Sequence, residues 1–144
     1  MNKQKIIEYL KEYKYCLDWI EIYNDKANSN MGMSYSHSNT TKTNEVNSDV
    51  ESKVLDKDEK WEEYKDKKKY IKSINKVLDK LPDDERMVIE HEFNLIDNDY
   101  YSKFPVGDVP HADLIANMPF SSPTYYKKRK NAYEILKNYM SAVI

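Results

Sequence analysis

The side chains with the clearest chemistry lie between residues 121 and 130, where hydroxyl, aromatic and basic groups gather. This run reads Ser-Ser-Pro-Thr-Tyr-Tyr-Lys-Lys-Arg-Lys. Hydroxyl groups and cations are the donors that bind phosphate oxygens and base edges of DNA. A short apolar segment over residues 112–118 precedes the run, and Pro119 separates the two. A short helix, a tight break and a longer helix that begins with such donors are typical of a DNA-reading helix-turn-helix.

The spacing predicts where these two helices begin and end. The first covers about residues 111–118 and stops at Pro119. We expect Ser122 to be the N-cap of the second helix, with Pro123 in its first turn, and we expect that helix to reach about residue 140. Helical periodicity places one stripe toward the core, which comprises Tyr125, Ala132, Leu136 and Tyr139. The opposite side carries Pro123, Thr124, Tyr126, Lys127, Lys130 and Asn131.

The N-terminal half predicts two long helices and a loop. Residues 3–26 carry a narrow apolar stripe with helical spacing, which comprises Ile6, Leu10, Tyr13, Leu17 and Ile20. Residues 27–49 are polar and aperiodic, so we expect a flexible loop there. Helical periodicity returns over residues 50–81 and should end before Pro82. Residues 1–80 are therefore expected to form an antiparallel helical hairpin.

A third helix is predicted directly after Pro82. Asp83 or Asp84 can cap it, and acids in a first turn are favoured by the helix dipole. Its expected core residues are Met87 or Val88, then Ile89 and Phe93. Residues 94–110 contain Asn, Asp, Gly and Pro and predict a loop.

Charge is distributed unevenly along a chain whose formal net charge is only −2. Residues 83–99 are strongly acidic, with Arg86 as the single basic residue. Residues 121–140 are basic, with Glu134 as the single acid. This uneven distribution of charge says more about binding partners than the net charge of the whole chain does. The acidic segment has two interpretations: a solvated helix, or a surface that avoids DNA and faces a protein such as RNA polymerase.

Composition argues against several other classes of protein. The single cysteine, Cys16, excludes an internal disulfide and fits a small buried side chain in a reducing compartment. No apolar run is long enough to span a membrane, and no signal-peptide core is present, so we expect a cytoplasmic protein without membrane association.

Catalytic and metal-binding patterns are also not expected. His91-Glu92 begins like the zinc-protease box, but Leu95 stands where its second histidine would be. With Gly32 and Gly107 as its two glycines, the chain has no glycine-rich phosphate loop. No nucleophile, base and orienting group stand together, so we expect a non-enzyme with no metal and no cofactor.

Two motifs resemble a known family. Leu-Pro-Asp-Asp-Glu-Arg-Met-Val-Ile, residues 81–89, resembles the Leu-Pro-x-x-Glu-Arg-x-Val-Ile/Leu opening of the fourth conserved region of sigma factors. Residues 124–136 are similar to the recognition helix of that region, and the likeness covers about residues 78–140. With Thr-Tyr-Tyr-Lys and the polar N-terminal loop, the chain resembles the RinA/ArpU group of phage late transcription regulators. It departs from sigma factors in its longer 94–110 linker and in Lys128, where an apolar residue is usual.

This resemblance implies a fold and a function. The fold is all-α: an N-terminal two-helix antiparallel hairpin with a long flexible loop, then a sigma region-four-like helix-turn-helix over residues 81–144. The implied function is a sequence-specific DNA-binding transcriptional activator, encoded by a phage or prophage, that acts on late packaging, structural or lysis genes. The second helix of the motif would enter the major groove of double-stranded DNA while the first braces it. The setting would be the cytoplasm of a bacterial host.

The resemblance, together with the division of the second helix into a core-facing stripe and an opposite side, indicates the DNA-contacting residues. Base or phosphate contacts are expected from Thr124, Tyr126, Lys127 and Lys130. Ser121 and Ser122 are candidates for phosphate contacts at the helix N-terminus. Phosphate contacts that add affinity rather than sequence choice are expected from Lys128, Arg129 and Lys137.

Two other functions stay open at this point. A DNA-packaging adaptor, like a small terminase subunit, also joins a helix-turn-helix to an oligomerising helical part, and the narrow stripe in residues 3–26 is compatible with one. Alternatively, the helix-turn-helix is structural only and the acidic chain binds a protein. For the activator we expect a monomer or a dimer rather than a ring.

Overall fold

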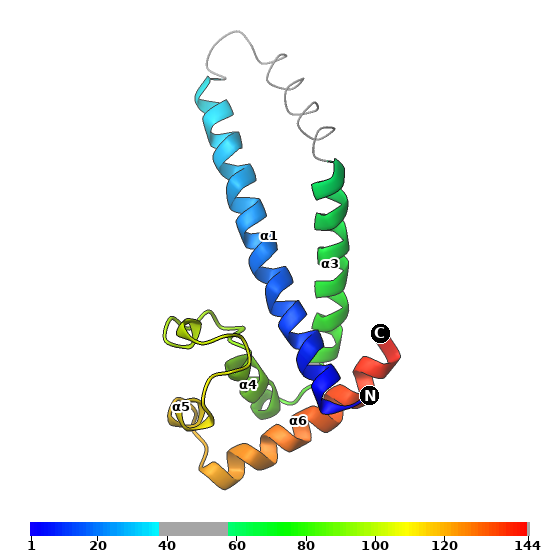
Figure 1. Cartoon of the computed structure of the whole chain (residues 1–144), viewed down its shortest axis with the longest axis vertical. Helices are drawn as coiled ribbons and strands as arrows, with labels where there is room; N and C mark the ends of the chain where they lie inside the picture. The colour runs from blue at the N-terminus through cyan, green and yellow to red at the C-terminus, as the bar shows by residue number, and fades with distance from the viewer. Residues whose placement is uncertain (38–57, 144) are drawn as a thin grey trace. The chain divides into compact units, whose positions relative to one another are not determined.

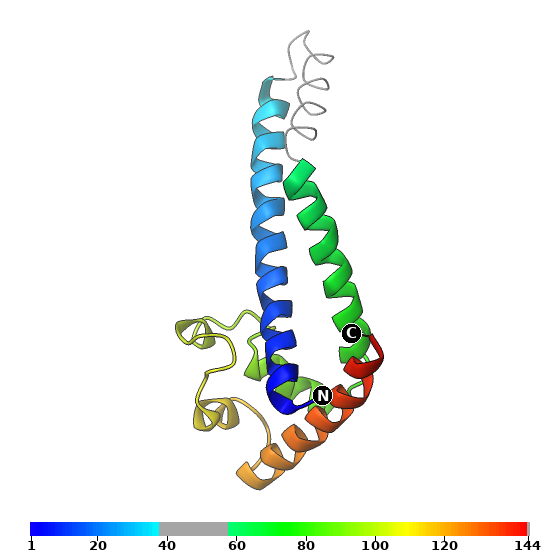
Figure 2. The ribbon, with the colours of Figure 1, turned by 45° about the vertical axis from the view of Figure 1, so that its right-hand side comes forward.

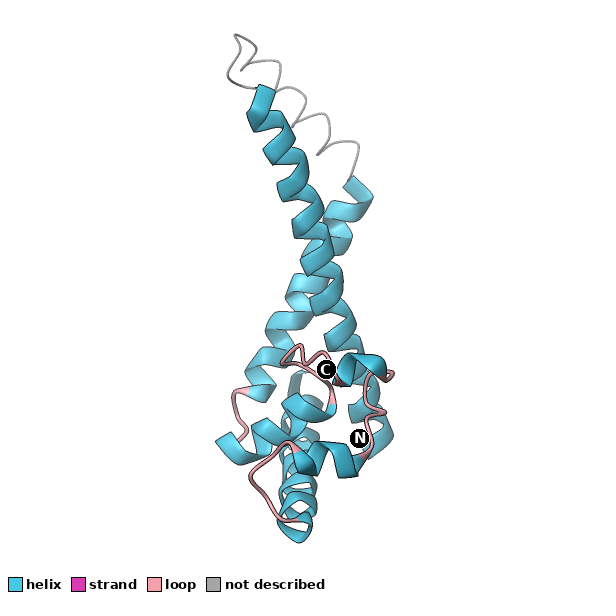
Figure 3. Cartoon of the chain, turned by 90° about the vertical axis from the view of Figure 1, so that its left-hand side faces the viewer, coloured by secondary structure: helices cyan, strands magenta, loops and turns pink. Residues whose placement is uncertain are grey.

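The computed structural model describes residues 1–37 and 58–143, and every regular element in those ranges is helical (Figures 1 and 3). In chain order the elements are α1 (Lys3–His37), α3 (Asp58–Leu78), α4 (Asp83–Glu92), the 3-10 turn η1 (Tyr101–Lys103), α5 (His111–Ala116) and α6 (Ser122–Val143). The all-α prediction is confirmed for these ranges. The start of the predicted second helix, residues 50–57, lies outside the described residues.

The first helix continues past its predicted end. The sequence predicts a loop over residues 27–49, whereas α1 runs to His37. Each Ser or Asn costs a helix only about 0.5 kcal/mol relative to the best helix formers. Extending a helix that already exists is also far less costly than nucleating one. The loop prediction is therefore wrong for residues 27–37, and residues 38–49 lie outside the described part of the chain.

The chain divides into two compact units. The first unit comprises Met1–Tyr15 and Ile71–Ile144, and the second comprises Cys16–Tyr70. This division differs from the predicted boundary at residue 80, because the first turns of α1 and the last turns of α3 belong with α4, α5 and α6. The buried side chains that these helix ends contribute to the first unit include Ile6, Leu10, Ile74 and Leu78.

Aromatic rings bring α1 and α3 together in the second unit, where the two helices run side by side (Figure 2). The ring of Tyr23 stacks on Trp19 at 5.2 Å and on Tyr64 at 4.9 Å between centroids. Tyr64 in turn stacks on Trp61 at 5.4 Å. The ammonium of Lys67 lies 5.2 Å from the centroid of Trp19. Stacked rings and cations over their faces both stabilise such a contact.

Within the first unit, α4 and α6 pack against each other. Val88, Ile89 and Phe93 are buried as predicted, whereas Met87 is only partly buried. A cluster of buried side chains joins α4 to the elements that follow it, and it comprises Val88, Tyr101, Val109, Leu114, Met118 and Tyr125. Because this cluster includes residues of η1, α5 and α6, it fixes the short helix and the long helix on one core.

The helix caps differ from prediction by one residue. Pro82, not an aspartate, is the N-cap of α4, and Asp83 and Asp84 lie in its first turn without a capping hydrogen bond. At the start of α6 the Oγ atom of Ser121 accepts the backbone N–H of Thr124 at 3.4 Å. Ser122, the predicted cap, is already the first residue of α6. The acids of α4 therefore act through the helix dipole rather than as caps.

The predicted loop over residues 94–110 is confirmed, with η1 as its only regular turn. Asn94 adopts a positive φ of 51°, and its side chain accepts the Asn98 N–H at 2.7 Å. Gly107 has a φ of 84°, and a Cβ atom there would lie 3.1 Å from the Cε atom of Lys11. The positive φ favours glycine at that position, whereas the flexible end of the Lys11 side chain can move away from an added Cβ.

Candidate nucleic-acid interface

A hydrogen bond joins the first residue of α5 to the first turn of α6. The hydroxyl of Tyr125 lies 2.8 Å from Nδ1 of His111. Burial raises the pKa of Tyr125 well above its ordinary value, so the phenol keeps its proton. Burial, and then the charge of Arg129, lower the pKa of His111. A protonated phenol beside a neutral imidazole donates to the ring nitrogen, so this bond holds the two helices in register.

A buried carboxylate on α4 holds two side chains of α6. The Arg129 guanidinium and the Tyr133 hydroxyl both donate to Glu92. The Glu92 side chain is 4% exposed and that of Arg129 is 16% exposed. Burial lowers the pKa of Arg129, but Glu92 outweighs this effect and keeps that pKa above its ordinary value. Arg129 was expected to touch phosphate; its guanidinium is instead bound inside the first unit, since a buried carboxylate needs a partner.

Lys128 is also engaged with α4. Its ammonium lies 3.3 Å from the Asp84 carboxylate and 3.4 Å from that of Glu85. The hydrogen bond to Asp84, together with the charge of Glu85, raises the pKa of Lys128. An ion pair thus occupies the position at which the resemblance to sigma factors predicts an apolar residue. The phosphate role of Lys128 stays a prediction, and its ammonium would have to leave these two carboxylates to contact DNA.

The other predicted DNA-contacting residues remain available on the outside of α6. Thr124 is half-buried, and the exposed ones are Ser121, Ser122, Tyr126, Lys127, Lys130 and Lys137. Among the described residues, no carboxylate lies within ion-pair distance of Lys127, Lys130 or Lys137. A hollow of about 550 Å³ lies along this side, and it is lined by Glu85, Thr124, Lys127, Lys128, Lys130, Asn131 and Glu134. The hollow therefore presents hydroxyl, ammonium and amide donors together with two carboxylates.

The buried stripe of α6 follows the prediction except at one position. Tyr125, Ala132 and Leu136 are fully buried, but Tyr139 is 44% exposed. Tyr133 and Met140 are buried in its place. Because an α-helix has 3.6 residues per turn, residues three and four positions further along both lie close to the same face. The buried stripe can therefore continue through either of two neighbouring positions after two turns. The hydrogen bond from Tyr133 to Glu92 selects the observed side.

Sequence reasoning missed the inward-facing acids. Glu85 and Glu92 are both buried, although the sequence predicts a solvated helix or a polymerase-facing surface over residues 83–99. Their spacing carried a signal, because Glu85, Val88 and Glu92 follow one another at steps of three and four, on the face of the predicted core. These two acids position α6 instead of facing outward.

Other kinds of site find no support within residues 1–37 and 58–143. No group of His, Cys, Asp and Glu side chains there is arranged to hold a metal ion. His91 instead makes a 2.8 Å hydrogen bond with the hydroxyl of Tyr101. Over the same ranges, no helix combines the length and apolarity that crossing a membrane requires. No protein family, no curated protein and no solved structure matches this chain.

Proposed function

We propose that this protein is a sequence-specific DNA-binding transcriptional regulator in which α5 and α6 act as a helix-turn-helix. One observation carries the proposal: α6 buries Tyr125, Ala132 and Leu136 against the core, while the lysine ammonium groups on its outer side pair with no carboxylate among the described residues. A helix of this kind fits the major groove, which is about 12 Å wide, and can present its first turns to base edges.

The predicted DNA-contacting side chains that remain available at the start and along the outside of α6 each have a role in this proposal. Thr124, Tyr126 and Lys127 lie in the first two turns and would read base edges. Ser121 and Ser122 would bind phosphate at the helix N-terminus, where the backbone amides favour an anion. Lys130 and Lys137 would bind phosphates of the DNA backbone.

The internal ion pairs explain how a chain of net charge −2 can bind DNA at all. Glu92 is matched by Arg129, and Glu85 by Lys128. These pairs engage Glu85 and Glu92, so Lys127, Lys130 and Lys137 outnumber Glu134, the one acid of α6, on its outer side. Local potential, rather than the total charge, governs the attraction of a polyanion.

The resemblance to the fourth region of sigma factors extends the proposal. We propose that α1 and α3 form an antiparallel hairpin and that the protein is a phage or prophage activator of late genes that acts beside RNA polymerase in the bacterial cytoplasm. Within the motif segment Leu81 is buried, and the Arg86 guanidinium lies 2.9 Å from the Asp79 carboxylate. No catalytic role is part of the proposal.

Replacement of the reading residues tests the proposal. The variant with Thr124→Ala, Tyr126→Ala and Lys127→Ala should lose promoter activation and site-specific protection of DNA while it keeps its melting temperature. The matched control is Lys76→Ala, because Lys76 is an exposed lysine of α3 and lies outside the proposed helix-turn-helix. This variant should activate normally. Intact activation by the triple variant would contradict the proposal.

One observation favours the packaging-adaptor alternative. Large apolar side chains are exposed on the second unit, with Ile22 at 69% and Trp61 at 40%. Exposed apolar surface of this kind can serve an oligomer interface. Light scattering distinguishes the two functions, because a packaging adaptor forms a large ring, whereas the activator should be a monomer or a dimer.

A further inference from the structure

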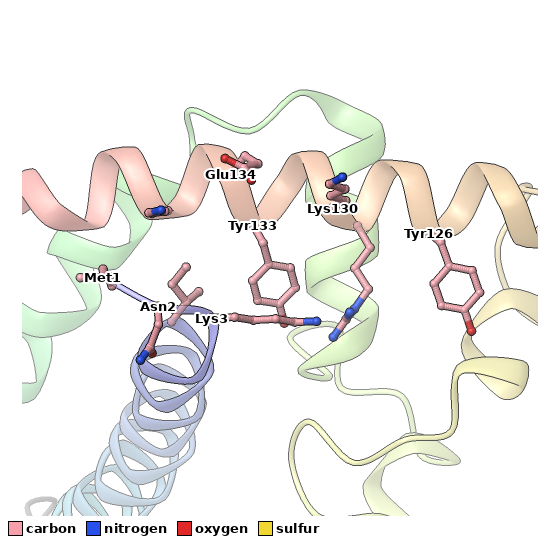
Figure 4. A pocket seen from close by; sticks show the side chains of 10 residues that line it. Met1, Asn2, Lys3, Tyr126, Lys130, Tyr133 and Glu134 are labelled. Carbon is pink, nitrogen blue, oxygen red and sulfur yellow. The ribbon is translucent and has the colours of Figure 1, made fainter.

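A second hollow lies on the other flank of α6, against the first turn of α1 (Figure 4). Its volume is about 280 Å³, and it lies wholly within the first unit. The side chains that matter below are Asn2, Lys3, Tyr126, Lys130, Tyr133 and Lys137. Figure 4 shows Lys3 of α1 and Tyr133 of α6 reaching toward each other across it.

The hollow is positively charged. Lys3, Lys130 and Lys137 are all exposed, and no ion pair engages their ammonium groups among the described residues. Glu134 is the one acid in the described lining. Three ammonium groups therefore face one carboxylate. A cleft lined by one sign of charge concentrates ions of the opposite sign.

The walls of the hollow are held in place. Tyr133 is buried and its hydroxyl donates to Glu92, so its ring cannot swing out. The Lys3 ammonium lies 5.2 Å from the centroid of that ring, a cation–π distance. Asn2 accepts the backbone N–H of Lys5 at 2.9 Å and so caps α1. The positive end of the α1 dipole therefore also lies at the hollow.

The chemistry of the hollow selects a phosphate group. Ammonium groups, a tyrosine hydroxyl and a helix N-terminus are all donors to phosphate oxygens. Tyr126 is 48% exposed, and its ring is fixed by stacking on Tyr125 at 5.0 Å. Tyr126 and Lys130 belong both to this hollow and to the proposed DNA-binding side of α6. A DNA strand that follows this flank of α6 would bring its phosphates to the hollow.

We infer that this hollow binds a backbone phosphodiester of DNA, so that the first turn of α1 is part of the interface. The inference rests on the proposed function. Lys3 is its distinguishing residue, because it lies far from the helix-turn-helix in sequence and enters the hollow only through the fold.

A matched pair of variants tests the inference. Lys3→Gln and Lys5→Gln each remove one positive charge from the start of α1, but Lys5 does not line the hollow and instead lies 3.8 Å from Glu8. DNA affinity is measured by fluorescence anisotropy at several salt concentrations, on the selected site and on scrambled DNA. Lys3→Gln should lower the log–log salt slope by about one and weaken binding to both DNAs by the same factor. Lys5→Gln should match the wild type, and Lys3→Arg should restore the slope.

The outcomes separate this inference from the proposed function. If the wild-type protein does not bind DNA, the proposed function fails. If the wild type binds and Lys3→Gln keeps its slope, the inference is overturned and the proposed function stands. Inorganic phosphate, titrated into the free 15N-labelled protein, distinguishes the other source of a phosphate group. Phosphate-induced shifts around Lys3, together with unchanged DNA binding by Lys3→Gln, would assign the hollow to free phosphate and overturn the inference.

Discussion

The guanidinium of Arg129 on α6 donates a hydrogen bond to the carboxylate of Glu92 on α4, and both side chains are largely buried. Glu92 also accepts the Tyr133 hydroxyl, so one buried acid holds two points of α6 a turn apart. The carboxylate thereby sets the rotation of α6 about its axis. That rotation decides which side chains face outward.

Removal of Arg129 should therefore destabilise the fold more than removal of a surface lysine. Arg129→Ala leaves Glu92 buried without its counter-charge, and breaking such a pair costs about 3–5 kcal/mol. Lys130→Ala, the exposed neighbour, should change the free energy of unfolding by less than about 0.5 kcal/mol. Chemical denaturation of both variants measures the difference, and equal effects would show that the Arg129–Glu92 pair is not structural.

The two serines before Pro123 should differ in their effect on stability. Ser121→Ala removes the side chain that accepts the Thr124 N–H, and the loss of an N-cap costs about 0.5–2 kcal/mol. Ser122→Ala removes an exposed hydroxyl in the helix and should leave stability nearly unchanged. Thermal denaturation of the two variants compares them. A larger loss of stability for Ser122→Ala than for Ser121→Ala would show instead that Ser122 is the cap.

Stability should fall as the pH drops below about 6.5. Burial lowers the pKa values of His91 and His111 from that ordinary value in the folded protein. Well above pH 6.5 both states hold neutral imidazoles, so these groups add no pH dependence there. Below it the unfolded chain takes up protons that the folded chain resists, and the free energy of unfolding decreases.

The double variant His91→Gln, His111→Gln tests this origin of the pH dependence. Its stability should vary less than that of the wild type between about pH 5 and 6.5, the range in which histidine titrates. Urea denaturation at each pH provides the measurement. A wild-type curve that is flat or rises toward acid in this range would contradict the assignment.

Two substitutions on α6 should affect DNA binding in different ways. Thr124→Ala should relax the preference at one base position, at a cost of about 1–3 kcal/mol on the selected site. Lys137→Gln should instead weaken binding to all sequences alike and reduce the salt slope by about one. Anisotropy titrations against the site and its single-base variants distinguish these patterns. The same pattern for both variants would refute the division between reading and phosphate-binding residues.

Local signals predicted much of this fold. Pro82 directly precedes α4 as predicted, and the apolar spacing of Val88, Ile89 and Phe93 identified its buried face. Pro119 lies between α5 and α6 as predicted, although α5 already ends at Ala116. These features depend on backbone chemistry and periodicity, which a single sequence carries. The exposed positions of Tyr126 and Lys127 followed from the same periodicity.

The remaining features depend on partners far away in the chain. The sequence predicts Glu92 to be solvated or to face a protein such as RNA polymerase, because its partners, Arg129 and Tyr133, lie on a different helix. Burial of a charge is decided by what surrounds it, not by its neighbours in sequence. The role of Lys3 was missed for the same reason, because only folding brings it to α6.

Selection of binding sites from a random double-stranded DNA library, with the full chain as bait, tests the central claim most directly. The account predicts enrichment of one sequence motif, bound with a log–log salt slope of several units that reports the phosphates engaged. It also predicts that the variant with Thr124→Ala, Tyr126→Ala and Lys127→Ala enriches no motif. No enrichment with the folded wild-type protein, or equal weak binding to selected and scrambled DNA, would contradict it.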